Sequence, residues 1–289
     1  MLVTDLDGTL LNSKGEVSLG NLRAIRRAAA QGIEVVVATG RSWIECREIA
    51  AMVAPAGHAI TAGGAALHSV ASGRCEDSVA VSHDLVQHCT ESLTRHGHLA
   101  HLLKDPERAG YDYLLVGDAE LDPASKWWFS IHPLATRSVP SLEDHEGGRE
   151  GALAHVLRVG TVASATQLAE VYRQIRDEVG ERLAIKHWPA LVALGSAGAD
   201  THLLEIFYAT VDKWTMVLRL CESRGLSPED VVAVGDGLND LRMLGSAGVS
   251  YAVANAEPLA AAAGRRRAPT NDEDALAFVV DEILGSSGP

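Results

Sequence analysis

The sequence predicts an α/β protein: a doubly wound, Rossmann-like parallel sheet with an inserted α+β domain. Two observations support this fold class. Strand and helix patterns alternate near both ends of the 289 residues, whereas the middle has shorter and more mixed segments. The apolar strands of the alternating parts run directly into polar residues. We therefore expect a core of residues 1–79 and 209–289, and an inserted α+β domain of residues 80–208.

The first core segment alternates strand and helix. Apolar residues at helical spacing predict a helix that begins after Ser18 as N-cap and ends at Gly32. In order, the expected elements are a strand over 1–6, a helix over 18–31, a strand over 33–38, a helix over 43–53 and a strand over 58–62. This order predicts parallel strands with crossover helices.

The middle of the chain predicts an antiparallel sheet with helices. Three prolines, Pro123, Pro133 and Pro140, interrupt it, and residues 143–151 are polar and glycine-rich. The expected helices cover 85–95 and 165–178, and the expected strands cover 113–116, 153–159, 183–187 and 202–207, with 191–194 as a candidate for one more.

Alternation returns after Asp212. The patterns predict helices over 213–223, 258–263 and 274–284, strands over 231–234 and 249–253, and a frayed tail over 285–289. The core is therefore split in sequence, with its two parts on either side of the insert.

Composition limits the classes of partner. A formal charge of −13 repels nucleic acid and anionic membranes, and the 47% apolar content is enough for two packed cores. The four cysteines form no C-x-x-C pair, no apolar run reaches membrane-spanning length, and no basic segment with an apolar run precedes the first strand. We expect no secretory signal, no membrane or nucleic-acid partner, and a cytoplasmic location.

Two carboxylates follow the first strand. Residues two apart in a strand point to the same side, so Asp5 and Asp7 can converge on one site at its carboxyl end. Open α/β sheets bind their ligands at that edge. Such a pair can bind a hard cation, divide into nucleophile and general acid, or do both. Asp and Gly are also ordinary turn residues, so the pair alone leaves a plain turn open.

Three further segments converge on the same edge: Thr39, Lys213 and the pair Asp236 and Asp240. Phosphoryl transfer needs this set, because a carboxylate nucleophile and a phosphate repel one another by several kcal/mol at a few ångströms. A Mg²⁺ ion held by carboxylates, together with one lysine, offsets that repulsion. Singly, each has a plainer explanation: a surface lysine, a helix N-cap at Thr39, or a turn and a helix cap over 235–240.

The four segments resemble the motifs of the haloacid dehalogenase (HAD) superfamily. Residues 5–9 match D-x-D-G-T, 39–41 match the Thr-Gly-Arg form of the second motif, Lys213 matches the third, and 235–240 match G-D-x-x-N-D. The Thr-Gly-Arg form is similar to the Cof-type phosphatases, whose cap is inserted after the third core strand. The resemblance covers both core parts.

The resemblance implies the roles of the catalytic and metal-binding residues. Asp5 would be the nucleophile and a Mg²⁺ ligand, and Asp7 the general acid and base, with its main-chain carbonyl on the metal. The other implied roles are metal binding by Asp236 and Asp240, binding of phosphate and Asp5 by Lys213, a hydroxyl donor on Thr39, and phosphate or substrate binding by Leu6, Gly40, Arg41 and Asn239.

Two residues depart from the family pattern. Gly63 stands where Asn is frequent, which puts a polar contact near the site in doubt. Trp214 follows the motif lysine, where Gly is usual, and would either pack against the cap hinge or narrow the pocket.

The substrate is the least predictable part. In the insert, Lys186 and His187 are expected to contact it, and residues 127–129 are either cap core or a substrate platform. The resemblance implies a Mg²⁺-dependent phosphatase that hydrolyses a small phosphomonoester, such as a sugar phosphate, through an aspartyl-phosphate on Asp5. A phosphotransferase or phosphomutase, and a non-catalytic regulator that binds a phosphorylated metabolite, stay open. The sequence does not predict an oligomeric state.

Overall fold

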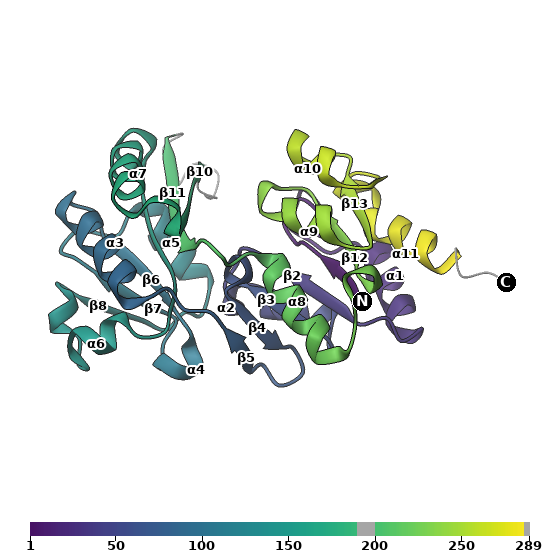
Figure 1. Ribbon diagram of the computed structural model, residues 1–289, viewed down its shortest axis with the longest axis horizontal. Coiled ribbons are helices and arrows are strands. Elements are labelled where there is room, and N and C mark those ends of the chain that lie inside the picture. Colours follow the sequence, from purple (N-terminus) through teal and green to yellow (C-terminus); the bar gives the residue numbers. More distant parts are fainter. Residues whose placement is uncertain (190–199, 286–289) are drawn as a thin grey trace. The chain divides into compact units, whose positions relative to one another are not determined.

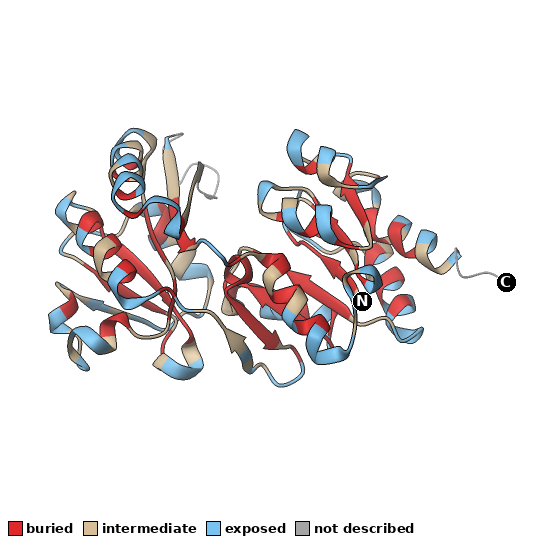
Figure 2. Cartoon of the chain, viewed as in Figure 1, coloured by how far each residue is buried: buried red, intermediate tan, exposed pale blue. Residues whose placement is uncertain are grey.

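The computed structural model describes residues 1–189 and 200–285, which form two compact units (Figure 1). One unit comprises Met1–Asp77 and Asp212–Pro289, and the other, Ser78–Val211, is inserted in it. The predicted strand over 191–194 and all but the first residue of the predicted tail lie outside the described residues. Each unit has its own sheet, whose central strands are buried and drawn in red in Figure 2.

The sheet of the first unit contains eight strands in the order β14-β13-β12-β1-β2-β3-β4-β5. In chain order they are β1 (Leu2–Thr4), β2 (Val35–Ala38), β3 (His58–Thr61), β4 (Ala66–Ser69), β5 (Cys75–Ser78), β12 (Val232–Gly235), β13 (Val249–Val253) and β14 (Arg266–Ala268). Strands β14 to β3 pair in parallel, with β1 between β2 and β12 at the centre.

One edge of this sheet adds antiparallel strands to the predicted parallel core. Strand β4 pairs with β3 in the antiparallel direction. The connection between them is a short turn over Ala62–Gly64, in which Gly63 and Gly64 have φ angles of +68° and +110°. Parallel neighbours need a crossover of about a dozen residues, so a turn this short forces the chain to reverse.

Helices cover both faces of the core sheet, as a doubly wound fold requires. Helices α1 (Leu19–Ala30), α2 (Trp43–Val53) and α11 (Ala275–Gly285) share one apolar cluster with the sheet. The other helices of this unit also contact the sheet but do not belong to that cluster: α8 (Lys213–Arg224), α9 (Leu241–Ser246) and α10 (Pro258–Ala263). The predicted α/β fold class is confirmed.

Local capping explains where α1 begins and ends. The Ser18 hydroxyl accepts a hydrogen bond from the Asn21 amide, and Gly32, with φ of +80°, lets the chain leave the helix. The buried face is formed by Asn21, Ala24, Ile25 and Ala28, while Leu19 is exposed.

The inserted unit is an α+β domain with a six-stranded sheet in the order β10-β11-β9-β6-β7-β8. Its strands are β6 (Ala100–Lys104), β7 (Tyr113–Val116), β8 (Thr136–Val139), β9 (Val156–Ser164), β10 (Leu183–Pro189) and β11 (Thr201–Tyr208). All its pairs are antiparallel except β7 with β8. The predicted antiparallel sheet is therefore corrected to a mixed one, because helix α5 (Pro123–Ile131) supplies a crossover between β7 and β8.

The helices of the inserted unit lie mainly on one face of its sheet. Helices α3 (His83–Arg95), α6 (Gly148–Leu153) and α7 (Ala165–Val179) share an apolar cluster with that face, and α4 (Pro106–Ala109) is a single turn. Pro123 begins α5 instead of breaking the chain, because Asp122 caps the helix and its first position needs no amide hydrogen. Among the described residues, no helix has both the length and the apolar character needed to cross a membrane.

Candidate active site

The chemistry-bearing residues lie at the carboxyl ends of three adjacent parallel strands. Asp5 follows β1, Thr39 follows β2 and Asp236 follows β12, while Lys213 is the first residue of α8. These strands pair directly with one another. The fold thus brings together residues that are more than 200 positions apart in the sequence.

Lys213 is fully buried and binds two carboxylates. Its Nζ lies 2.5 Å from Asp5 Oδ1 and 2.7 Å from Asp240 Oδ1. Asp212 caps the helix by accepting from the Thr215 amide at 2.7 Å, which fixes where α8 begins. A cation at the first position of a helix lies at the positive end of the macrodipole, which is unfavourable by several tenths of a kcal/mol. The explanation of Lys213 as a surface lysine is wrong.

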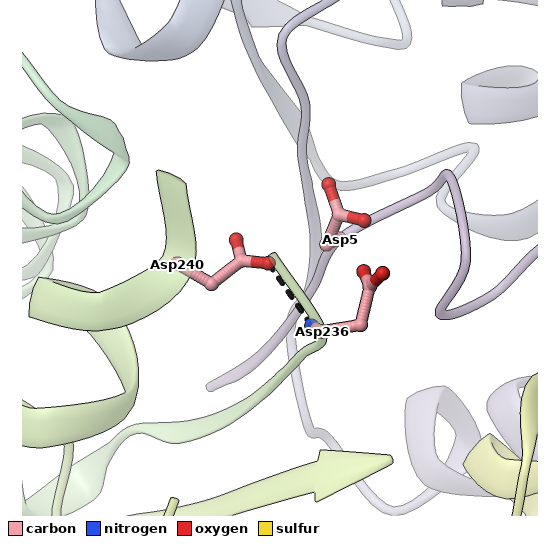
Figure 3. A group of neighbouring side chains, drawn as sticks. All are labelled: Asp5, Asp236 and Asp240. Atoms are coloured by element: carbon pink, nitrogen blue, oxygen red, sulfur yellow. Dashed lines mark hydrogen bonds between the residues drawn. The ribbon is translucent and has the colours of Figure 1, made fainter. Parts of the chain in front are cut away.

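Three carboxylates form the centre of the site. Asp5, Asp236 and Asp240 each place an oxygen within 4.8 Å of the others (Figure 3). Asp236 Oδ1 accepts a hydrogen bond from the Thr9 hydroxyl at 2.8 Å. Asp240 Oδ2 accepts from the main-chain amides of Asp236 and Gly237 at 3.1 and 3.0 Å, so it holds the turn after β12 and faces Lys213 with its other oxygen.

The site carries more negative than positive charge. Burial, with the charges of Asp240 and Asp236, raises the pKa of Asp5 well above its usual range, although Lys213 opposes the shift. Burial also raises the pKa of Asp236. Burial lowers the pKa of Lys213, but Asp240 and Asp5 outweigh it and the net shift is upward. One lysine therefore does not balance three carboxylates.

This arrangement fits a hard divalent cation. Carboxylate oxygens are the ligands that Mg²⁺ and Ca²⁺ prefer, and three of them converge here on one point from two loops. Asp7 contributes no carboxylate to this group. Its predicted metal contact is through the main-chain carbonyl and stays a prediction.

The loop after β1 is shaped by close approach to Asp236. Gly8 has φ of +79°, and a Cβ there would lie 2.3 Å from Asp236 Oδ2. The Asn255 side chain donates to the Gly8 carbonyl at 2.8 Å, and Asn271 donates to the Leu11 carbonyl at 2.8 Å. Only glycine satisfies both the backbone angle and the space, and two asparagines hold the loop from outside.

Asp7 is bound to Arg41. Nε of Arg41 lies 2.9 Å from Asp7 Oδ2, and a terminal guanidinium nitrogen lies 2.5 Å from Oδ1. The sequence did not indicate this pair, because 34 residues and one strand crossover separate its members. Their place in adjacent strand-end motifs was the available signal.

The Thr39 side chain stabilises the turn formed by the second motif, residues 39–41. Its hydroxyl accepts from the Arg41 amide at 3.1 Å. Ser42, not Thr39, is the N-cap of α2, so the explanation of Thr39 as the cap of that helix is wrong. The Asn239 side chain faces Gly40: a Cβ at that glycine would lie 4.0 Å from Asn239 Nδ2. Leu6 is buried, and its carbonyl accepts from the Leu11 amide at 2.9 Å.

Of the two departures from the motif pattern, Trp214 follows Lys213 directly, and Gly63 lies beside Gly64 in the turn after β3. Trp214 is 3% exposed within α8. Gly64 approaches so closely that a Cβ would lie 2.1 Å from the Asp212 carbonyl oxygen. The glycines of this turn therefore allow β3 and the start of α8 to meet.

Lys186 and His187 point to opposite faces of the inserted sheet, because neighbours in a strand alternate. His187 packs against His202, with ring centroids 4.8 Å apart. Lys186 lies on the other face, with its Nζ 5.2 Å from the centroid of the Phe207 ring. The two side chains therefore cannot line one site together. Phe129 packs against His101 and Tyr113, at ring distances of 5.8 and 5.3 Å.

Comparison with known proteins agrees with this geometry. The chain is 28% identical to the phosphatase YwpJ of Bacillus subtilis, over 98% of this chain and 99% of the relative. It is 24% identical to the 5-amino-6-(5-phospho-D-ribitylamino)uracil phosphatase YcsE of the same organism, over 97% and 94%.

A similar fold occurs among solved structures. A haloacid dehalogenase-like hydrolase from Bacteroides thetaiotaomicron matches with a TM-score of 0.78 and 25% identity, over 98% of both chains. The family model of the haloacid dehalogenase-like hydrolases matches residues 2–280. The chain is therefore an enzyme of the haloacid dehalogenase-like hydrolase family, in agreement with the resemblance of its four motifs to the Cof-type phosphatases.

Proposed function

We propose that the chain is a Mg²⁺-dependent phosphatase that hydrolyses a small phosphomonoester through an aspartyl-phosphate on Asp5. The observation that carries the proposal is the contact of buried Lys213 with both Asp5 and Asp240, beside a third carboxylate. A carboxylate held against a cation in this way is oriented for attack on phosphorus, and the charge of Lys213 opposes the rise in the pKa of Asp5 that burial causes.

The reaction assigns one task to each of two carboxylates. Asp5 attacks the phosphorus, and the bond to the leaving oxygen breaks as Asp7 protonates that oxygen. Asp7 then takes a proton from water, which attacks the phosphorus and restores the Asp5 carboxylate. Thr39, Arg41, Asn239 and the amides of Leu6, Asp7 and Gly40 bind phosphoryl oxygens.

Asp5, Asp236, Asp240 and the Asp7 carbonyl would hold the Mg²⁺ ion. When bound, Mg²⁺ would neutralise the excess charge of the carboxylates and polarise a phosphoryl oxygen. Burial raises the pKa values of Asp5 and Asp236, and the neighbouring carboxylates raise them further. A cation bound between these carboxylates would favour their charged forms.

The inserted unit is proposed as the cap that selects the substrate, with Lys186 and His187 as candidate contacts. Because these two point to opposite faces, at most one of them belongs to the substrate site. The named relatives act on phosphorylated compounds, one of them on a phosphoribityl-aminouracil, so small cytoplasmic phosphometabolites are the proposed substrates.

Two alternatives use the same residues. A phosphotransferase or phosphomutase would transfer the group to a hydroxyl instead of water, and a regulator would bind the phosphometabolite without reaction. The regulator is disfavoured, because binding alone needs no buried nucleophile paired with lysine.

The test is turnover of p-nitrophenyl phosphate with and without Mg²⁺. Wild type is expected to require Mg²⁺, and Asp5→Asn to lose at least about 10³-fold in kcat. Equal rates in the two proteins would overturn the mechanism. Release of free phosphate from a panel of sugar phosphates and ribityl phosphates then separates hydrolysis from isomerisation and identifies the substrate class.

A further inference from the structure

Arg41 holds the carboxylate that the proposed function assigns as general acid and base. Both Asp7 oxygens accept from its guanidinium, at 2.9 and 2.5 Å. A carboxylate bound through both oxygens by one planar fork is fixed in orientation. While this pair persists, both Asp7 oxygens are held toward Arg41.

The two partners differ in how firmly they are anchored. The Arg41 side chain is 19% exposed, whereas that of Asp7 is 47% exposed. The Arg41 amide donates to Thr39 Oγ1 at 3.1 Å, and its carbonyl accepts from the Ala62 amide at 2.7 Å. Arg41 is therefore anchored through its main chain, and its side chain is the more buried member of the pair.

The main chain next to Asp7 is also held. The Gly8 carbonyl accepts from Asn255, and the Asp5 amide donates to the Val234 carbonyl at 3.0 Å. Release of Asp7 therefore requires rotation of its own side chain and no rearrangement of the loop.

A guanidinium fork binds phosphate oxygens with the same geometry that it uses for a carboxylate. A phosphoryl group that enters the site therefore competes with Asp7 for Arg41. Resting on the proposed function, we propose that Arg41 positions Asp7 in the ligand-free protein and exchanges it for phosphoryl oxygens, which frees Asp7 to act on the leaving group. Substrate binding and release of the general acid are then one event.

The alternative is a permanent ion pair that only orders the loop after β1. The two cases differ in what phosphate does to the pair. A permanent pair is unaffected by phosphate, whereas an exchanging pair is broken by it.

The first experiment measures inorganic phosphate binding by calorimetry at fixed Mg²⁺, in wild type, Asp7→Asn, Arg41→Ala and the double variant. Asp7→Asn is expected to tighten phosphate binding about five-fold when Arg41 is present, the upper range for a partly exposed ion pair. In the Arg41→Ala background the same change should alter binding less than two-fold. If Asp7→Asn tightens phosphate binding equally with and without Arg41, the effect comes only from the loss of a negative charge. That result would overturn the proposed exchange.

The second experiment measures denaturant unfolding of the same four proteins. Without phosphate, the effect of the double variant on the unfolding equilibrium constant should differ by about five-fold from the product of the two single effects. At saturating phosphate the two effects should be additive in free energy. Additivity without phosphate, or coupling that phosphate leaves unchanged, would overturn the proposal.

The two experiments also separate this proposal from the proposed function. One outcome is that wild type turns over p-nitrophenyl phosphate while the comparison of the four proteins shows no exchange. In that case only the proposed exchange at Arg41 is wrong, and the proposed function stands. If none of the four proteins binds phosphate, the exchange fails, and the result counts against the proposed function as well.

Discussion

Two ionic clusters lie at opposite ends of the core sheet, and their charge balance differs. The acidic cluster, at the carboxyl ends of the strands, comprises Asp5, Asp236, Asp240 and Lys213. The histidine cluster, at the amino ends of β2 and β3, comprises Glu34, His58, Glu76 and Arg224. Helix α8 joins them, because it begins with Lys213 and ends with Arg224.

The histidine cluster is nearly balanced. His58 lies between two glutamates, with Nδ1 2.6 Å from Glu34 Oε1 and Nε2 3.2 Å from Glu76 Oε2, and Arg224 Nε lies 3.3 Å from Glu34 Oε2. Hydrogen bonding to Glu34 raises the pKa of His58, and the same bond lowers that of Glu34. Each charge has a partner, and the pKa shifts favour the charged forms.

The pKa shifts of the acidic cluster have the opposite effect on the charged forms. The pKa values of Asp5 and Asp236 rise, which disfavours their charged forms. Buried charge without compensation costs stability and is retained where chemistry needs it. Both clusters contain ion pairs, so an ion pair alone does not identify a functional site. The excess of negative charge distinguishes the acidic cluster from the histidine cluster.

The largest contrast is expected from one substitution at each end of α8. Lys213→Met should lower kcat by about 10²–10³-fold, because the cation beside Asp5 is lost. Arg224→Met should leave kcat within about two-fold and lower the unfolding free energy by less than about 1 kcal/mol, since Arg224 is partly exposed. Steady-state kinetics and urea unfolding of both variants check this, and similar kinetic losses at the two ends would break the distinction.

Two glycines with the same backbone angle test how tightly the acidic cluster is packed. Gly8→Ala should lower kcat by about 10²-fold, because a Cβ 2.3 Å from Asp236 Oδ2 displaces that carboxylate. Gly32→Ala is the control: its φ is +80°, but no atom lies within 4 Å of its Cβ. It should cost about 1 kcal/mol of stability and no activity. An active Gly8→Ala enzyme would contradict the placement of Asp236.

The histidine cluster should give the smaller, pH-dependent effect. Because the folded-state pKa of His58 is raised, its stabilisation is fully present below the unfolded pKa and is lost as pH rises through the folded pKa. In wild type the unfolding free energy should fall by about 1–2 kcal/mol as pH rises from below the unfolded histidine pKa of about 6.5 to above the raised folded pKa, the value of a hydrogen bond to a charged group. Parallel curves for wild type and His58→Gln would show that His58 does not contribute.

The sequence predicted the acidic cluster better than the rest of the molecule. Strand-end position was enough to bring Asp5, Thr39 and Asp236 together, because parallel strands share an edge. Lys213 begins helix α8, and its match to the third motif was the signal that placed it there. Strand β13 and helix α10 have the predicted bounds, since each has a continuous apolar pattern and clear ends.

What the sequence did not predict depends on tertiary contacts. Strand β5 reads Cys-Glu-Asp-Ser and has no apolar pattern, so its assignment comes from its place at the sheet edge. The contact of His58 with Glu34 and Glu76 joins residues from three strand ends. The opposite directions of Lys186 and His187, by contrast, follow from strand alternation and were available from the sequence.

Cation binding is the most direct test of the claim that excess negative charge marks the functional end of the sheet. The measurement is the unfolding free energy of wild type and Asp236→Asn as Mg²⁺ is raised. Without Mg²⁺, Asp236→Asn should be the more stable protein, because one repelling carboxylate is gone. At 100 times the dissociation constant, wild type should gain about 2.7 kcal/mol and the variant much less. Equal stabilisation of both proteins by Mg²⁺, or none in wild type, would contradict the account.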